Sequence, residues 1–399
     1  MAMSMAKRRV GKSLPVDLLL EIVACSDVKT IVRFARTCRA LRLAILDRPF
    51  RRRLALQSAA DGGGGGGFEP ALLRGVSFLR HTFHSLVPAH RVIHAPYRRK
   101  HRIRLDTTGS LWKQFRPVAS RDDLLLLRGK RGIFLSDGEA PTYELRVCDT
   151  ITGQITPLPP TTVADVFPHV FLSVGDGDAG ASYELLVADA DMRFQTFSSK
   201  SGQWGDVRQA SVPPEHQQTL HASSRPAVVI NRTVYWISPV NGILALDVDA
   251  EAATTMDLPP GCFSTTMAIQ KDKHLLLASV HGRLCLLAAE RRGISMWTLA
   301  AESTATWTWE LVIGGQEIRK LVGLSISHLP FVLEAFGERS GAVIVRVDGQ
   351  PWNQGHGLLR LDLGTKVVTR LHNLGNASVS CLVLHETNLL SVLQAMKSF

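Results

Sequence analysis

Two hydrophobic patterns divide the chain. From residue 13 to residue 57, apolar side chains recur every three or four positions, which is the period of helices that bury one face. Beyond residue 105 this period disappears, and short apolar segments alternate with turn pairs such as Asn241-Gly242 and Asp348-Gly349. The sequence therefore predicts a small helical unit followed by an all-β region of about 300 residues.

Three short helices are expected in the N-terminal unit. The first begins near Pro15, which suits a first helical position, and its apolar face comprises Leu14, Leu18, Leu19, Ile22 and Val23. The apolar positions of the second are Ile31, Phe34, Ala35, Cys38, Leu41, Leu43 and Ile45. Pro49 interrupts this pattern, and Phe50 belongs to a short third helix. A core of this size is marginal alone, so we expect a partner surface to complete its burial.

A weak repeat runs through the β region. Comparable strand-and-turn segments begin near Val147, Phe194, Leu244, Met296 and Leu359, at intervals of 47, 50, 52 and 63 residues. A period near 40–50 residues is typical of four-stranded propeller blades, so residues 106–399 are predicted to form a β-propeller of six or seven degenerate blades. Strands are expected at 124–127, 145–148, 185–189, 228–230, 233–237, 243–247, 274–279, 284–287, 343–347 and 358–362.

Composition and charge define the remaining segments. Residues 1–12 are expected to be a basic disordered arm and residues 58–70 a flexible glycine-rich linker. Residues 71–105 are expected to be a basic bridging segment, which could be a helical bridge or part of the propeller. Residues 1–105 hold 21 Lys and Arg against six Asp and Glu, whereas residues 106–399 hold 25 against 29. The excess positive charge therefore lies in the first quarter, where it could attract nucleic acid or an acidic protein.

The sequence offers no constellation for catalysis or metal binding. Six scattered cysteines fit neither a zinc site nor a disulfide scaffold, and indicate reduced thiols in a cytoplasmic or nuclear protein. Four histidines lie within fourteen residues without a zinc-like spacing, namely His81, His84, His90 and His94. No apolar run is long enough to span a membrane, and no hydrolase, Rossmann or phosphate-loop motif is present. We therefore expect no metal, no cofactor, no membrane contact and no enzymatic activity.

The helical unit resembles an F-box. The resemblance rests on Leu14-Pro15-x-Asp17-Leu18-Leu19-x-Glu21-Ile22, on Ile31-Val32-x-Phe34-Ala35-x-Thr37-Cys38-Arg39, and on Asp47-x-Pro49-Phe50. Many F-boxes carry Trp shortly after the Cys-Lys/Arg pair, where this chain has Leu41. The β region resembles the propeller-like domain that follows the F-box in many plant proteins, with an opening strand similar to that of grass members. The similar segments are 119–127, 147–160, 234–247 and 293–297.

This resemblance implies a non-catalytic adaptor of a Skp–cullin–F-box ubiquitin ligase. The F-box would bind a Skp-family protein and through it a cullin, while the propeller would recruit the protein to be ubiquitinated. Residues expected in the helical core and the Skp contact are Leu14, Pro15, Leu18, Leu19, Ile22, Val23, Ile31, Phe34, Leu41 and Phe50.

Two other functions are compatible with the sequence. A basic nucleic-acid-associated protein would use the N-terminal quarter, although few aromatic residues lie among its basic clusters to stack on bases. A propeller hydrolase would need polar groups that converge on the central channel. Among the tryptophans, Trp236, Trp297, Trp307 and Trp309 are expected mostly in the blade cores. Trp352, in a turn-rich segment, is the candidate substrate contact, because exposed aromatic residues often dominate binding energy.

Overall fold

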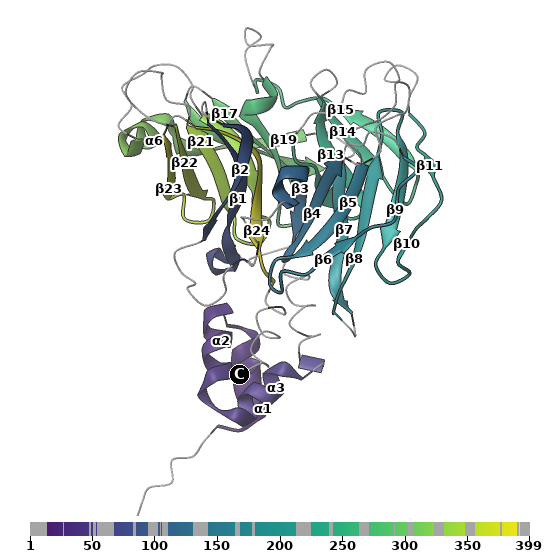
Figure 1. The fold of residues 1–399 in the computed structure, drawn as a ribbon. Helices are drawn as coiled ribbons and strands as arrows, with labels where there is room; N and C mark the ends of the chain where they lie inside the picture. The colour runs from purple at the N-terminus through teal and green to yellow at the C-terminus, as the bar shows by residue number, and fades with distance from the viewer. Residues whose placement is uncertain are drawn as a thin grey trace, which may run out of the picture.

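The fold was analysed in a computed structural model of the chain (Figure 1). It describes residues 14–26, 28–47, 49–50, 53, 68–82, 85–94, 103, 105, 111–130, 143–163, 168–177, 180–212, 225–238, 242–262, 271–290, 292–301, 306–322, 331–347, 356–375, 377–388 and 391. Trp352, the predicted substrate contact, and residues 1–12 lie outside this part of the chain.

The N-terminal unit is helical, as predicted. Its helices are α1 (Val16–Ala24), α2 (Val28–Thr37) and α3 (Arg39–Leu46). Phe50 lies in a further helical segment. The prediction that the second helix continues through Ile45 is wrong, because Cys38 divides this segment into α2 and α3. The backbone of Cys38 is extended, and its Sγ accepts a hydrogen bond from the Leu41 amide at 3.3 Å, so Cys38 is the N-cap of α3.

Six sheets, counted over the described residues, form the blades of a six-bladed β-propeller. Blade 1 contains β3 (Phe115–Arg121), β4 (Leu124–Lys130), β5 (Tyr143–Asp149) and β6 (Ile155–Pro157). Blade 2 contains β7 (His169–Gly177), β8 (Gly180–Ala188), β9 (Arg193–Ser198), β10 (Gln203–Trp204) and β11 (Arg208–Gln209). Blade 3 contains β12 (Val228–Ile230), β13 (Thr233–Ser238), β14 (Gly242–Asp247) and β15 (Ala252–Met256).

The chain closes the ring with strands from both of its ends. Blade 4 contains β16 (Leu275–Val280), β17 (Arg283–Glu290), β18 (Gly293–Ala301) and β19 (Thr306–Gly314), and blade 5 contains β20 (Phe331–Phe336), β21 (Ala342–Val347), β22 (His356–Asp362) and β23 (Val368–Gly375). Blade 6 has the order β24 (Ser378–Glu386), β1 (Leu73–Thr82) and β2 (Ser85–His94). The short helices are η2 (Pro70–Leu72), α5 (Leu111–Gln114), η4 (Lys271–His274) and α6 (Gly315–Val322).

The first strands of successive blades form the inside of the ring. Each of β3, β7, β12, β16, β20 and β24 contacts the next, and β24 contacts β3, so the ring is complete. Of the two possibilities for residues 71–105, a helical bridge or a part of the propeller, the structure supports the second, because the segment supplies β1 and β2 of blade 6. The propeller therefore begins before residue 106, because β1 is the strand that pairs with β24.

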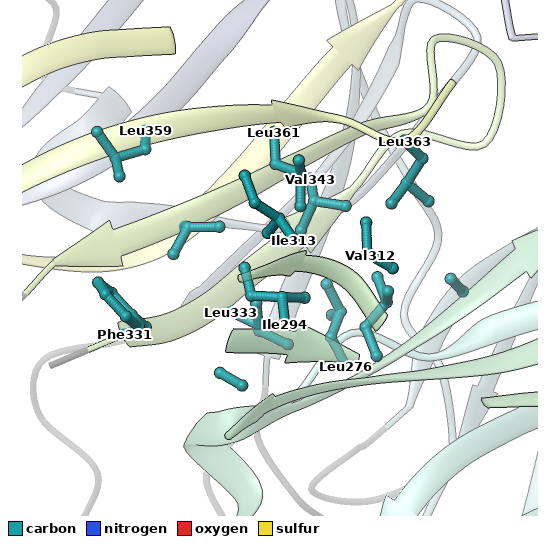
Figure 2. Packing of buried hydrophobic residues seen from close by; sticks show 14 of the residues in the cluster. Leu276, Ile294, Val312, Ile313, Phe331, Leu333, Val343, Leu359, Leu361 and Leu363 are labelled. Carbon is teal, nitrogen blue, oxygen red and sulfur yellow. The ribbon is translucent and has the colours of Figure 1, made fainter. Parts of the chain in front are cut away.

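Apolar clusters between neighbouring blades hold the ring together. The cluster between blades 4 and 5, for example, joins Leu276 and Ile294 to Leu333, Val343 and Leu361, all almost fully buried (Figure 2). Corresponding clusters lie between every other pair of neighbouring blades, including the pair made by blades 6 and 1, where Val383 packs with blade 1 residues. Both faces of each blade are therefore covered, which explains why short, nearly continuous apolar segments were visible in the sequence.

The repeat seen in the sequence corresponds to one structural position. Val147, Phe194, Leu244, Met296 and Leu359 all lie in the third strand of their blades, β5, β9, β14, β18 and β22. The ten predicted strands also fall on strands of the structure. Six blades, the lower of the two predicted numbers, are present.

Candidate functional site

The core of the helical unit is filled by its own side chains. Its buried members are Val23, Ile31, Ala35, Leu41, Ile45, Leu46 and Phe50, and Leu19, Leu20, Ala24, Val32 and Phe34 pack partly against them. The Nε of Arg42 donates a hydrogen bond to the carbonyl of Ala35 at 2.9 Å, which ties α3 to α2. This small unit has thus used one apolar side of α1 to assemble its core.

A second apolar stripe on α1 remains in solvent. Leu18 is 51% exposed and Ile22 47%, and their spacing of four residues aligns them along one side of α1, while Leu14, which precedes the N-cap Pro15, is 53% exposed. Val16 is exposed as well, and Leu43 on α3 is 60% exposed. Apolar side chains gathered in this way are typical of an interaction surface.

Glu21 on α1, next to Ile22 in the sequence, forms an ion pair with Arg53. The carboxylate of Glu21 accepts two hydrogen bonds from the guanidinium of Arg53, both at 2.5 Å. The hydrogen bond from Arg53 is the main cause that lowers the pKa of Glu21. Because both side chains are exposed, the pair fixes the position of Arg53 against α1 more than it stabilises the fold.

The ten residues predicted for the core and the Skp contact occupy three environments. Leu14, Pro15, Leu18 and Ile22 are exposed, Leu19 and Phe34 are half-buried, and Val23, Ile31, Leu41 and Phe50 are buried. The structure therefore separates residues that a partner can touch from residues that only support them. The sequence analysis counted Leu43 among the apolar core positions of a helix. Leu43 is two residues from both Leu41 and Ile45, so its side chain lies on the opposite side of α3 from theirs.

A second cluster of polar residues joins the two ends of the propeller. We call Arg74, Asp122, Asp123, Arg339 and Glu386 the closure cluster. Arg74 on β1 pairs with Asp123 at 2.5 Å with both side chains buried, and Asp123 also accepts a hydrogen bond from Thr387 at 2.6 Å. Arg339, after β20, forms an ion pair with Asp122, and the Glu386 carboxylate accepts the backbone amide of Ser340 at 2.8 Å.

The geometry of the closure cluster is structural. Asp122 and Asp123 form the two-residue turn between β3 and β4, both with positive φ, as a tight hairpin requires. Their carboxylates are each occupied by an arginine from another blade. Both carboxylates are therefore engaged in closing the ring.

The N-terminal segment, which we define as the chain up to Glu69, contacts the propeller near this cluster through Phe68 and Glu69. The ring of Phe68 stacks on His281 with centroids 5.3 Å apart and meets Phe336 edge-on. The amide of Glu69 donates to the carbonyl of Arg339 at 3.0 Å. A Cβ at Gly341, whose φ is +66°, would collide with the Phe68 ring, so this glycine makes room for the attachment.

The tryptophans differ in burial. Trp236 is buried as expected, and Trp297 and Trp307 are half-buried beside the cluster between blades 3 and 4. Trp309, expected in a blade core, is 51% exposed because β19 is the outermost strand of blade 4. Its ring lies 6.3 Å from that of Trp297, its partner across the two strands.

Two negative findings concern the described residues alone. No group of three or more His, Cys, Asp and Glu side chains there is placed to hold a metal ion. No helix in the same part of the chain has the length and apolar character needed to cross a membrane.

The fold and its exposed helical stripe define a class: an F-box-like unit followed by a six-bladed β-propeller. Residues 12–57 match a family model described as F-box-like. Residues 75–399 match the family described as "Domain of unknown function (DUF7595)", and the chain belongs to that family. This match includes nearly all of β1, in agreement with the place of that strand in blade 6.

Solved structures give distant similarities. A structure described as a puromycin-hydrolysing peptidase of Mycobacterium tuberculosis is 12% identical, with a TM-score of 0.35, and the similarity covers 75% of this chain and 45% of that one. A structure of HIRA(644-1017) is 14% identical over 51% and 54% of the two chains, with a TM-score of 0.29. A Nidogen/Laminin complex is 10% identical over 78% and 99%, with a TM-score of 0.38. A search of curated proteins finds no match.

Proposed function

We propose that the protein is a non-catalytic substrate-recognition adaptor of a Skp–cullin–F-box ubiquitin ligase, of the kind found in plants. F-box-like domains generally bind Skp-family proteins. In this proposal the helical unit binds the Skp-family protein, a cullin joins through it, and the propeller holds the substrate protein. The adaptor would act in the cytoplasm, the nucleus or both.

One observation carries the proposal: the stripe of Leu14, Leu18 and Ile22 stays exposed although the helical unit already has a filled core. Burial of three such side chains in an interface would contribute several kcal/mol through removal of apolar surface from water. The buried residues behind the stripe hold it in place and need not touch the partner.

The adaptor would act by proximity. Binding the substrate and the ligase in one complex raises the effective concentration of substrate lysines near the ubiquitin-charged enzyme. Such a role requires no catalytic side chain in this protein.

The test is co-expression of the full chain with a plant Skp-family protein, followed by size-exclusion chromatography. We expect a 1:1 complex for the wild type and its loss in the variant Leu18→Asp/Ile22→Asp, because charges would be placed in an apolar interface. The matched control is Val367→Asp, since Val367 is an equally exposed apolar residue of blade 5.

Leu18 and Ile22 are both on the surface, so the circular dichroism and thermal unfolding of the double variant should match those of the wild type. A folded wild type that binds none of several Skp-family proteins, or a variant that binds as well as the wild type, would contradict the proposal.

A second candidate function rests on charge. Arg33 and Arg36 on α2 and Arg39 at the start of α3 are exposed, in a region with a strong excess of basic residues. A nucleic-acid-binding protein would show affinity for duplex DNA or RNA that falls steeply with salt. Binding that persists unchanged in Arg33→Gln/Arg36→Gln would exclude this use of the helices.

A further inference from the structure

Two arginines oppose each other at the start of blade 1. Arg116 on β3 and Arg128 on β4 are direct partners in the antiparallel register, so their side chains leave the same face of the sheet. Like charges in this position repel each other. Arg128 is buried, and its guanidinium lies 3.7 Å from the centroid of the Tyr143 ring, whereas Arg116 is exposed.

A histidine from the next blade lies within the electrostatic influence of both arginines. His169 is the first residue of β7, the inner strand that neighbours β3, and it is almost completely buried. Burial, followed by the positive charges of Arg128 and Arg116, lowers the pKa of His169 to about 3. The ring is therefore neutral at physiological pH and keeps one N–H for donation.

The charge of Arg116 is not neutralised by the described part of the chain, where its side chain forms neither an ion pair nor a hydrogen bond. The electrostatic influence of Arg116 reaches His169 and the thiol of Cys381 on β24. Arg116 thus lies on the inner strand of blade 1, which contacts the inner strands of blades 6 and 2.

This group lies far from the attachment of the N-terminal segment. Arg116 is at the beginning of β3, and Asp122 of the closure cluster follows the end of that strand. They are six positions apart along extended chain, which corresponds to about 20 Å. The arginines therefore belong to the end of the ring opposite Phe68 and Glu69, where a large partner would not meet the N-terminal segment.

We propose that Arg116 and Arg128, with His169 beside them, form a binding site for an oxyanion, either a carboxylate or a phosphate, carried by a ligand that enters this end of the propeller. An oxyanion beside Arg116 would supply a counter-charge that the described part of the chain does not, and the planar guanidinium of this exposed arginine can bind two oxygens at once. The site belongs to the propeller and does not depend on the function proposed for the helices.

The test is isothermal titration calorimetry of the full chain at constant ionic strength, with inorganic phosphate in one arm and glutarate in the other. We expect saturable binding of at least one probe and at least tenfold weaker binding by Arg116→Gln, since a hydrogen-bonded charge is lost. Arg370→Gln is the matched control, because Arg370 is an exposed arginine on the outer strand β23 and its removal changes the net charge equally. The probe that binds more tightly identifies the source of the oxyanion as phosphate or carboxylate.

A second readout separates binding from a structural role. Without any probe, Arg116→Gln should melt at the same temperature as the wild type or higher, because a repulsion is removed. With the probe, the wild type and Arg370→Gln should rise in melting temperature while Arg116→Gln does not. The proposal is overturned if neither probe binds, or if Arg116→Gln and Arg370→Gln bind equally well.

Discussion

His90 illustrates how one buried residue of blade 6 makes the free energy of unfolding depend on pH. Its ring stacks on Trp112 with centroids 3.6 Å apart and an angle of 5°, and neither ring nitrogen has a hydrogen-bond partner among the residues that the structure describes. Burial lowers the pKa of His90 from 6.5 to about 4. The unfolded chain therefore binds a proton between pH 6.5 and 4 that the native state does not, so the free energy of unfolding falls as the pH falls through this range.

Replacement of His90 by Phe should reduce this acid sensitivity. The wild type should lose about 1.4 kcal/mol per pH unit from His90 below pH 6.5, or about 2 kcal/mol at pH 5. His90→Phe keeps an aromatic ring on Trp112 and breaks no hydrogen bond, so it should lose less stability between pH 7 and pH 5. Urea unfolding at both pH values measures the difference, and identical losses in the two proteins would contradict the assignment.

Residues of the candidate site were only partly predictable from sequence. Helical periodicity correctly grouped Leu18, Ile22 and Val23 as apolar positions of one helix, although Leu14 of the same group precedes α1, and it could not show which of them α2 and α3 would cover. That depends on packing between helices. The sequence also could not predict that Arg116 and Arg128 face each other on neighbouring strands, because strand register is fixed by pairing rather than by local sequence.

At the scale of elements, prediction succeeded where strands are buried on both faces. The third strands of five blades gave the repeat because each is an apolar strand that pairs with the outer strand next in the sequence. Strands β1 and β2 were missed because their segment is basic, with Arg74 and Arg80 within β1, and because the inner strand of their blade lies at the other end of the chain. The sixth repeat was therefore divided between two distant segments.

The outer strand β19 gives a prediction for two tryptophans. Trp309→Thr should lower the free energy of unfolding by no more than about 1 kcal/mol, because half of the side chain is already in water and Thr suits a strand. Trp236→Ala should lower it by about 3–5 kcal/mol, because that ring is buried between blades 2 and 3. Guanidinium unfolding followed by circular dichroism compares the two, and equal losses would show that β19 is packed more deeply than its exposure indicates.

At the scale of the whole molecule, stability depends on the closure of the ring. Asp123→Asn should remove the carboxylate that pairs with the buried charge of Arg74 and lower the free energy of unfolding by about 3–5 kcal/mol. The control is Asp249→Asn, which removes an exposed partner of Arg232 and should lower it by less than about 1 kcal/mol. Urea unfolding monitored by tryptophan fluorescence gives both values, and similar effects of the two substitutions would mean that the closure cluster adds little to the ring.

The pairing of β1 with β24 also has a consequence for synthesis of the protein. About 300 residues separate the two strands, and at about 5–20 residues per second a ribosome needs about 15–60 s to make them. During that time β1 and β2 have no inner strand to join, while α1, α2 and α3, which have a core of their own, have already been made. The helical unit is thus available to a partner on the nascent chain before the propeller can close.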